Sequence, residues 1–162
     1  MRGKNRTGSG SPNLAAAGIR EVTFGSNVKV VKPVNLYGCT IGDDCFVGPF
    51  VEIQKDVSIG ARTRIQSHSF VCELVTIGED CAVAHGVMFI NDTYSNGGPA
   101  RGDRSLWKAT TIGNRVSIGS NATILPVRIV DDVVIGAGAV VTKDITERGT
   151  YAGNPARRIS KR

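Results

Sequence analysis

The chain has 162 residues, enough for one domain, and 41% of them are hydrophobic, as in ordinary globular proteins. Its net charge of +6 comes from the two ends, because residues 1–20 and 157–162 carry basic side chains and no acids. Only 6% of the residues are aromatic. These features argue against a nucleic-acid groove, which needs basic and aromatic side chains together on one folded face.

The sequence also bears on location and metal binding. No segment has the length of a membrane span or the pattern of a secretory signal, so we expect a cytoplasmic protein without a membrane partner. None of the four cysteines belongs to a CxxC or Cys/His metal motif. We therefore predict no metal site, and we interpret Cys45 and Cys81 as small buried residues in a reducing compartment.

The N-terminal segment differs in composition from the rest of the chain. Residues 1–20 are rich in Gly, Ser, Asn and Arg and show no periodicity, which predicts a disordered arm. Residues 21–162 are expected to form a single domain. A repeat begins weakly near Phe24 in this part of the chain and becomes regular at Ile41.

From Ile41 to Phe89, every sixth residue is aliphatic or aromatic, and glycine often follows it directly. The series is Ile41, Val47, Ile53, Ile59, Ile65, Val71, Ile77, Val83 and Phe89. A period of six is typical of a hexapeptide solenoid, in which three short strands form one triangular coil. The sequence therefore predicts an all-β, parallel β-helix whose aliphatic side chains point inward.

The period stops after Phe89, where residues 90–110 form a polar, turn-rich insert. Long excursions from a compact solenoid are often functional, so we predict a projecting loop with Trp107 as its docked anchor. The repeat resumes at Ile112 and ends at Val141, which gives about six coils in all. Residues 146–162 are expected to form a short basic C-terminal cap, helical over its last residues.

The phase of the repeat places particular side chains in a column along the solenoid. This column contains Pro49, Ser67, His85, Ser120 and Ala137. His68 lies one place off the column, one coil from His85, and the insert leaves the neighbouring face at the same level. We therefore expect both histidines, the loop and a strip of small residues to converge.

Three stretches carry a family resemblance: IGDDCFVGPFVEIQ in the repeat, FINDTYSNGG at the insert, and GAGAVVTKDI followed by AGNPARRI near the end. Over roughly residues 22–160, the chain resembles the left-handed β-helix acyltransferases, and more closely the sugar-nucleotide N-acetyltransferases of surface polysaccharide biosynthesis. The resemblance implies a left-handed coil and a homotrimer with active sites between subunits. It also implies acetyl transfer from acetyl-CoA to a nucleotide-linked amino sugar, such as a dTDP- or UDP-3-amino sugar, without specifying which one.

The same resemblance implies residues that bind acetyl-CoA. Its pantetheine arm would lie against Ser120, Ala137 and Gly138, where small side chains let the thioester approach the backbone. Its phosphates would meet the basic residues Lys143, Arg157, Arg158 and Lys161. The alternative interpretation is that the small residues only satisfy the coil and that the basic end is a solvated cap.

For the chemistry, a neutral amine must attack the thioester carbonyl, and a histidine can take its proton near pH 7. The base would be His85, on the column, or His68 beside it, while backbone amides stabilise the oxyanion. Some relatives carry Asn and Pro where His68 and His85 stand. In those proteins the thiolate leaving group or water would take the proton.

Residues at the insert would bind the acceptor. Asn91 and Asp92 match a family position that faces the sugar, and Gln66 could help them. An Asn-Asp pair also fits ordinary turn chemistry, so that alternative stays open. The nucleotide would meet loop side chains, namely Tyr94, Arg101, Arg104 and Trp107.

Three other functions compete with this interpretation. O-acetyl transfer to a sugar or another small hydroxyl acceptor would require a histidine base. A non-enzymatic scaffold subunit would keep the repeat but would not need the loop, the clustered histidines or the basic cap. A zinc hydratase would need three histidines per site, and the chain has only two.

Overall fold

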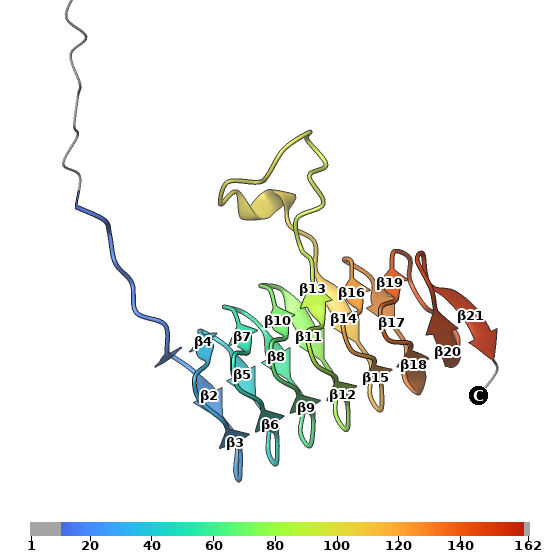
Figure 1. Ribbon diagram of the computed structural model, residues 1–162, viewed down its shortest axis with the longest axis horizontal. Helices are drawn as coiled ribbons and strands as arrows, with labels where there is room; N and C mark the ends of the chain where they lie inside the picture. The colour runs from blue at the N-terminus through green and yellow to red at the C-terminus, as the bar shows by residue number, and fades with distance from the viewer. Residues whose placement is uncertain (1–10, 161–162) are drawn as a thin grey trace, which may run out of the picture.

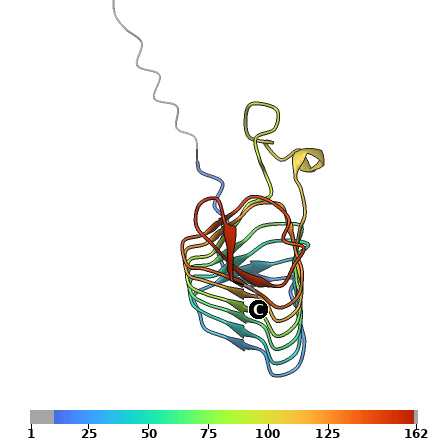
Figure 2. The same ribbon diagram turned by 90° about the vertical axis from the view of Figure 1, so that its right-hand side faces the viewer.

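The structure, a computed structural model, describes residues 11–160. From residue 19 onward the chain forms a left-handed parallel β-helix of about seven turns. Figure 1 shows the turns stacked along one axis, and Figure 2 shows their triangular outline seen along that axis. The all-β solenoid predicted from the six-residue period is confirmed.

The three faces of the prism are sheets, called here A, B and C. Sheet A consists of β1 (Ile19–Arg20), β4 (Asn35–Tyr37), β7 (Glu52–Ile53), β10 (Phe70–Val71), β13 (Met88–Phe89), β16 (Thr123–Ile124) and β19 (Val140–Val141). Sheet B consists of β2 (Thr23–Phe24), β5 (Thr40–Ile41), β8 (Ser58–Ile59), β11 (Val75–Ile77), β14 (Thr110–Ile112) and β17 (Arg128–Ile129). Sheet C consists of β3 (Lys29–Val30), β6 (Phe46–Val47), β9 (Arg64–Ile65), β12 (Ala82–Val83), β15 (Ser117–Ile118), β18 (Val133–Ile135), β20 (Gly149–Ala152) and β21 (Arg157–Ser160).

Turns connect the sheets along three edges of the prism. The CA edge, between sheets C and A, contains turns 48–51, 66–69, 84–87, 119–122 and 136–139. The AB edge contains turns 54–57, 72–74, 125–127 and 142–144, together with the long segment 90–109. The BC edge contains turns 42–45, 60–63, 78–81, 113–116 and 130–132. At most of these turns one residue has a positive φ, such as 64° at His68 and 59° at Arg62, which bends the chain sharply.

The core is a stack of like residues, because neighbouring strands pair in register. Ile41 pairs with Ile59 across sheet B, and Ile77 pairs with Ile112. All four side chains are buried, whereas the residue before each of them faces outward. A shift of one residue would reverse the two faces of a strand, so the inward aliphatic residues fix the register.

The projecting loop occupies residues 90–109 and contains a short 3₁₀ helix, η1 (Arg104–Leu106). Figure 1 shows it standing away from the prism between β13 and β14. Its position and approximate length agree with the insert predicted from the break in the period. The loop leaves the AB edge, where a short turn of the prism would otherwise lie.

Both ends of the solenoid extend further than the sequence indicated. Ile19 pairs with Leu36, so strand pairing begins ahead of the expected boundary at residue 21. Residues 1–10 of the expected disordered arm lie outside the described residues. The bridge between Ile129 and Ile145 and the pairing of β18 with β20 add the last turn.

The helix expected at the C-terminal end is wrong. β20 and β21 instead form an antiparallel pair that covers the last turn of sheet C. A segment of about six residues is too short for a stable helix, whereas pairing satisfies the backbone groups that the last strand exposes.

Candidate active site

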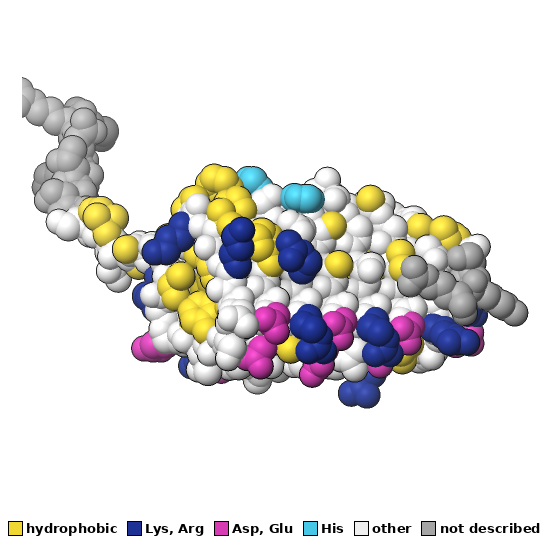
Figure 3. All heavy atoms as spheres, turned by 90° about the horizontal axis from the view of Figure 1, so that it is seen from below, with side chains coloured by type: hydrophobic (Ala, Val, Ile, Leu, Met, Phe, Trp, Pro, Cys, Tyr) yellow, Lys and Arg dark blue, Asp and Glu magenta, His cyan; other side chains and the backbone are white. Residues whose placement is uncertain are grey.

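The predicted column is present at the CA edge, where backbone hydrogen bonds link each turn to the next. The His68 N–H donates to the carbonyl of Pro49 at 3.2 Å, and the Asn121 N–H donates to the carbonyl of His85 at 2.8 Å. The Gly138 N–H donates in the same way to Ser120 at 2.8 Å. These bonds place the two histidines on adjacent turns of one edge, and Figure 3 shows both on the same side of the molecule.

The two histidines have different surroundings. The His68 ring stacks on Phe50, with ring centroids 4.8 Å apart and planes at 28°, so its neighbour on the previous turn supports it. The His85 side chain is exposed and lies on the rim of a groove. Contact with that groove makes His85 the better placed of the two for chemistry on a bound molecule.

The groove runs along the outer face of sheet C and has a volume of about 390 Å³. Gln66 and His85 lie on its rim, and its floor consists of the small or short residues Ala82, Ala84, Ser117, Gly119 and Val134. Gly119 is required by close packing of the turns, since a Cβ there would lie 2.4 Å from the backbone nitrogen of Ala137. Because the side chains that line the floor are small, a narrow ligand can lie close to the backbone there.

Several backbone donors along this edge are uncommitted. Within residues 11–160, the N–H groups of Ser67, His85, Ser120 and Ala137 donate to no protein acceptor. The same place on an earlier turn holds Pro49, which has no N–H, so the coil does not need this donor. These amides can serve a ligand, as expected from the sequence for an oxyanion.

The loop residues lie apart from the histidines within one chain. Asn91 and Asp92 leave the AB edge, whereas His85 lies at the CA edge, so the width of sheet A separates them. The predicted convergence therefore holds for the histidines and the small residues but not for the loop. The reason is that β13 crosses the whole face between His85 and the start of the loop.

The hydrogen bonds of Asn91 and Asp92 are those of a loop-forming pair. One oxygen of the Asp92 carboxylate accepts from the N–H of Tyr94 at 2.9 Å, and the other accepts from the N–H of Ala100 at 2.7 Å. The Asn91 amide donates to the carbonyl of Glu73 at 3.3 Å. Turn chemistry, one of the two interpretations of this pair, is thus observed, and a sugar-binding role stays a prediction.

The loop is attached to the prism through Arg104, a contact that sequence reasoning missed. Its guanidinium lies 2.5 Å from the Asp56 carboxylate and 3.0 Å from the Glu73 carboxylate, both on the AB edge. The Trp107 side chain, which the sequence suggested as the anchor, is half-buried. No periodic signal marks the partners of Arg104, because they lie 31 and 48 positions earlier in the chain.

The predicted phosphate-binding residues gather at the C-terminal end. Lys143, Arg157 and Arg158 line one hollow of about 280 Å³. The Arg158 side chain pairs with Glu147, whereas Lys143 and Arg157 form no ion pair with a described residue. Lys161 lies outside the described residues.

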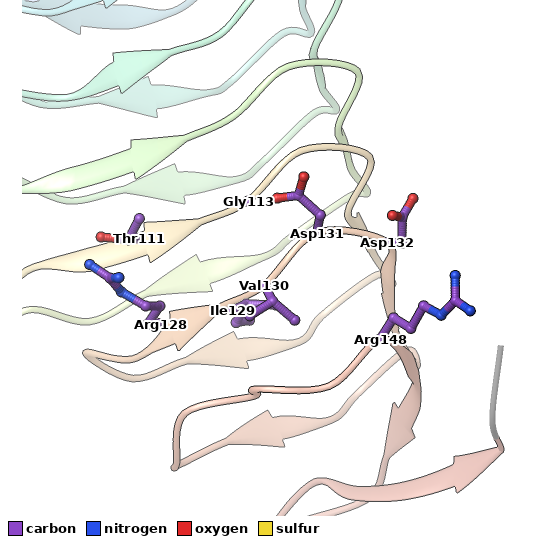
Figure 4. Close-up of a pocket in the computed structure, with 8 residues that line it drawn as sticks. All are labelled: Thr111, Gly113, Arg128, Ile129, Val130, Asp131, Asp132 and Arg148. Atoms are coloured by element: carbon purple, nitrogen blue, oxygen red, sulfur yellow. The ribbon is translucent and has the colours of Figure 1, made fainter.

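A larger hollow, of about 560 Å³, lies over the end of sheet B and contains none of the predicted site residues. Figure 4 shows Arg128 and Arg148 on opposite sides of it. Its two carboxylates, Asp131 and Asp132, are held by Arg115. The groove beside His85 is smaller, but it brings a predicted catalytic residue, His85, together with a predicted acceptor-binding residue, Gln66.

Cys39, Cys45, Cys72 and Cys81 are all buried, as predicted for Cys45 and Cys81. Burial raises the pKa of the Cys39 thiol to about 11 and the pKa of the Cys72 thiol to about 12. The Cys45 thiol donates to the carbonyl of Gly60 at 3.1 Å. Thiols of this kind stay protonated near neutral pH and are poor nucleophiles.

The described part of the chain lacks two further features. No group of three His, Cys, Asp or Glu side chains among residues 11–160 is arranged to hold a metal ion. Nor does any helix in these residues have the length and apolar character needed to cross a bilayer.

Two family models match the chain. One, described as the bacterial transferase hexapeptide with six repeats, matches residues 38–73, and the other, the hexapeptide repeat of succinyl-transferase, matches residues 109–143. The chain is thus similar to hexapeptide-repeat transferases over these two stretches, and its fold is the β-helix that such repeats form. These matches confirm the predicted resemblance to hexapeptide-repeat transferases, and the finer likeness to sugar-nucleotide N-acetyltransferases stays a prediction.

Individual relatives agree with this class. The bifunctional protein GlmU of Synechococcus sp. (strain CC9605) is 29% identical over 145 residues, which cover 88% of this chain but 29% of that protein. The chain thus spans less than a third of that curated relative. An AntD mutant, an N-acyltransferase from Bacillus cereus solved with dTDP and coenzyme A, has a TM-score of 0.76 at 21% identity, covering 86% of this chain and 84% of that one. A galactoside acetyltransferase solved with coenzyme A has a TM-score of 0.60 at 27% identity, covering 88% and 65%.

Proposed function

We propose that this chain is an acyltransferase that moves an acetyl group from acetyl-CoA to a sugar, and that the acceptor is the amine of a nucleotide-linked amino sugar. The observation that carries the proposal is the groove of about 390 Å³ beside His85. Its size lies within the range of about 300–1,000 Å³ typical of small-molecule sites. The similarity to a galactoside acetyltransferase and an N-acyltransferase, both solved with coenzyme A, supports the same reaction class.

The groove suits a long, thin co-substrate. Its floor at Ser117 and Gly119 is low, so a pantetheine arm can lie close to the backbone. The N–H groups of Ser120 and Ala137 would hydrogen-bond this arm, and Lys143 and Arg157 would meet the phosphates at the C-terminal end. When bound, acetyl-CoA supplies an acetyl group activated as a thioester.

His85 would act as the general base. It would accept a proton from the amine as the amine nitrogen bonds to the acetyl carbon, and it would return a proton to the departing sulfur or to solvent. Another free N–H at the CA edge, such as that of His85, would donate to the carbonyl oxygen as it gains negative charge. His68, one turn away and stacked on Phe50, is the alternative base.

The loop would complete the site from another chain. Asn91, Asp92, Tyr94, Arg101 and Trp107 lie at or beyond the AB edge, across sheet A from His85. In a homotrimer, the AB edge of one chain would face the CA edge of its neighbour, and these residues would contact the acceptor there. Gln66 would contact the acceptor from the same chain as His85.

The test is to incubate the protein with acetyl-CoA and a panel of dTDP- and UDP-linked amino sugars, and to measure free thiol and the acetylated product. The matched control is the same nucleotide sugars with a hydroxyl in place of the amine. We expect thiol release with at least one amino sugar and none with its hydroxyl counterpart. No thiol release with any acceptor would overturn the proposal and favour a scaffold role.

A second candidate is O-acetyl transfer to a sugar hydroxyl, and the similarity to a galactoside acetyltransferase favours it. The product distinguishes the two reactions, because hydroxylamine cleaves an acetyl ester and leaves an acetamide intact. Thiol release with the hydroxyl control sugars, and a product that hydroxylamine removes, would establish this alternative.

A further inference from the structure

The size of the outward side chains changes abruptly along sheet C, at a place that the proposed chemistry does not use. We call this change the step. The outward residues of successive strands are in register and run Phe46, Arg64, Ala82, Ser117 and Val134. Ala82, Ser117 and Val134 line the groove, so the side chains fall from large to small between Arg64 and Ala82. Arg64 therefore stands one strand before the floor, about 4.8 Å from it along the sheet.

The Arg64 guanidinium lies over the strand before it, on the side away from Ala82, and this contact does not neutralise its charge. The guanidinium carbon lies 4.5 Å from the centre of the Phe46 ring on that strand. Stacking of this kind orders the guanidinium and leaves its N–H groups free to donate. Within residues 11–160, Arg64 forms no ion pair or side-chain hydrogen bond.

Three other arginines behave differently. Arg62 pairs with Asp80 and Glu79, Arg115 pairs with Asp131 and Asp132, and Arg104 pairs with Asp56 and Glu73. Figure 3 shows basic side chains without neighbouring acids on the face between the histidines and the row of alternating acids and bases. A stacked, unpaired arginine next to a groove is suited to an anionic ligand, because its fork matches phosphate oxygens.

We infer that Arg64 binds the diphosphate of the acceptor nucleotide, with Gln66 beside it. Gln66 begins the turn that follows β9, two positions after Arg64, and it lines the groove. The basic residues expected for coenzyme A, Lys143 and Arg157, lie at the C-terminal end of the helix, beyond the other side of the groove. The groove would thus hold one anionic group at each end, with His85 on its rim between them.

This inference rests on the proposed function for the identity of the ligand, but its test does not require turnover. The affinities of dTDP, UDP, inorganic pyrophosphate and coenzyme A are measured by calorimetry on the full chain, with Arg64→Ala beside wild type. Arg64 is exposed, so this variant is expected to fold. We expect dTDP and UDP to bind Arg64→Ala about 10- to 100-fold more weakly, as for the loss of a charged hydrogen bond, with coenzyme A unchanged.

Three further variants sharpen the test. Arg62→Ala removes an arginine from the same turn that already has carboxylate partners, and its affinity for dTDP should match wild type. Arg64→Lys keeps the charge without the fork and should recover only part of the affinity. Phe46→Leu removes the aromatic face and should weaken dTDP binding about two- to fivefold.

The outcomes separate this inference from the proposed function. Three results would each overturn the inference on Arg64. The first is an equal loss of dTDP affinity in Arg62→Ala and Arg64→Ala, and the second is a loss of affinity for coenzyme A instead of dTDP. The third is that wild type binds none of dTDP, UDP and pyrophosphate. Arg64-dependent binding of dTDP in a protein without transferase activity would support the diphosphate site and overturn only the transferase. Transferase activity that is equal in wild type and Arg64→Ala would support the proposed function and overturn the diphosphate site.

Discussion

The CA and BC edges of the prism share a backbone but present opposite surfaces. Both turn through a left-handed residue at most rungs, as at His68 on one edge and Arg62 on the other. On the BC edge these positions alternate in charge, and Arg62 and Arg115 each bind two carboxylates, the row seen in Figure 3. On the CA edge they hold Phe50, His68, Gly86, Asn121 and Gly138, and no ion pair forms there among residues 11–160.

This difference indicates what each edge does. The charged side chains of the BC edge pair with one another, so a ligand would have to displace existing partners. The CA edge leaves backbone amides and an imidazole uncommitted next to a groove. Removing an outward side chain at the CA edge should therefore alter activity with little effect on stability, and removing a charged side chain at the BC edge should leave activity unchanged.

The strongest effect that we expect is on turnover, in His85→Ala. Loss of a general base typically lowers the rate about 10²- to 10⁴-fold, and the deficit should shrink at high pH, where the amine is already neutral. Initial rates of thiol release over a pH series, with His68→Ala as the comparison, measure this. A larger loss in His68→Ala would transfer the role of base to that residue.

The second prediction concerns Gly119, where the groove floor and the packing of the coil coincide. In Gly119→Ala the new Cβ would lie 2.4 Å from the nitrogen of Ala137, so the turns must separate. We expect a loss of about 1–3 kcal/mol in the free energy of unfolding, as for other overpacked sites. Urea denaturation measures it, and Gly98→Ala, with no atom within 4 Å of its Cβ, is the control. Equal stability of the two variants would contradict the close approach.

The third prediction tests the AB edge, which carries the loop. In Arg104→Ala the loop loses its ion pairs with Asp56 and Glu73, and the Glu73 carboxylate loses a cation at a largely buried position. Chymotrypsin should then cleave the loop about tenfold faster, because local opening governs proteolysis. Arg101→Ala, which removes an exposed arginine from the same loop, should be cleaved like wild type. Unchanged cleavage of Arg104→Ala would show that other contacts hold the loop.

The weakest effect should occur at the BC edge, in Arg62→Ala. The Arg62 pairs with Glu79 and Asp80 are exposed, so salt and water screen them. We expect a slight fall in melting temperature that vanishes at high salt, with normal acetyl transfer. A loss of activity comparable to that of His85→Ala would remove the distinction between the two edges.

Features that depend on the six-residue period could be predicted without coordinates. Because strands pair in register, residues at equal spacing stack along the helix axis. Counting residues therefore located the buried series from Ile41, the column through His85 and the exit point of the loop. Residues whose partners lie at multiples of one coil are predictable in this way.

Features without a period became visible only in three dimensions. The contacts of Arg104 with Asp56 and Glu73 join a loop to turns far earlier in the chain, and nothing local specifies them. The C-terminal hairpin formed because β18 offered an unpaired edge to β20, which a short segment considered alone does not reveal. The step from Arg64 to Ala82 and the separation of the loop from His85 by sheet A likewise depend on side-chain size and strand direction in space.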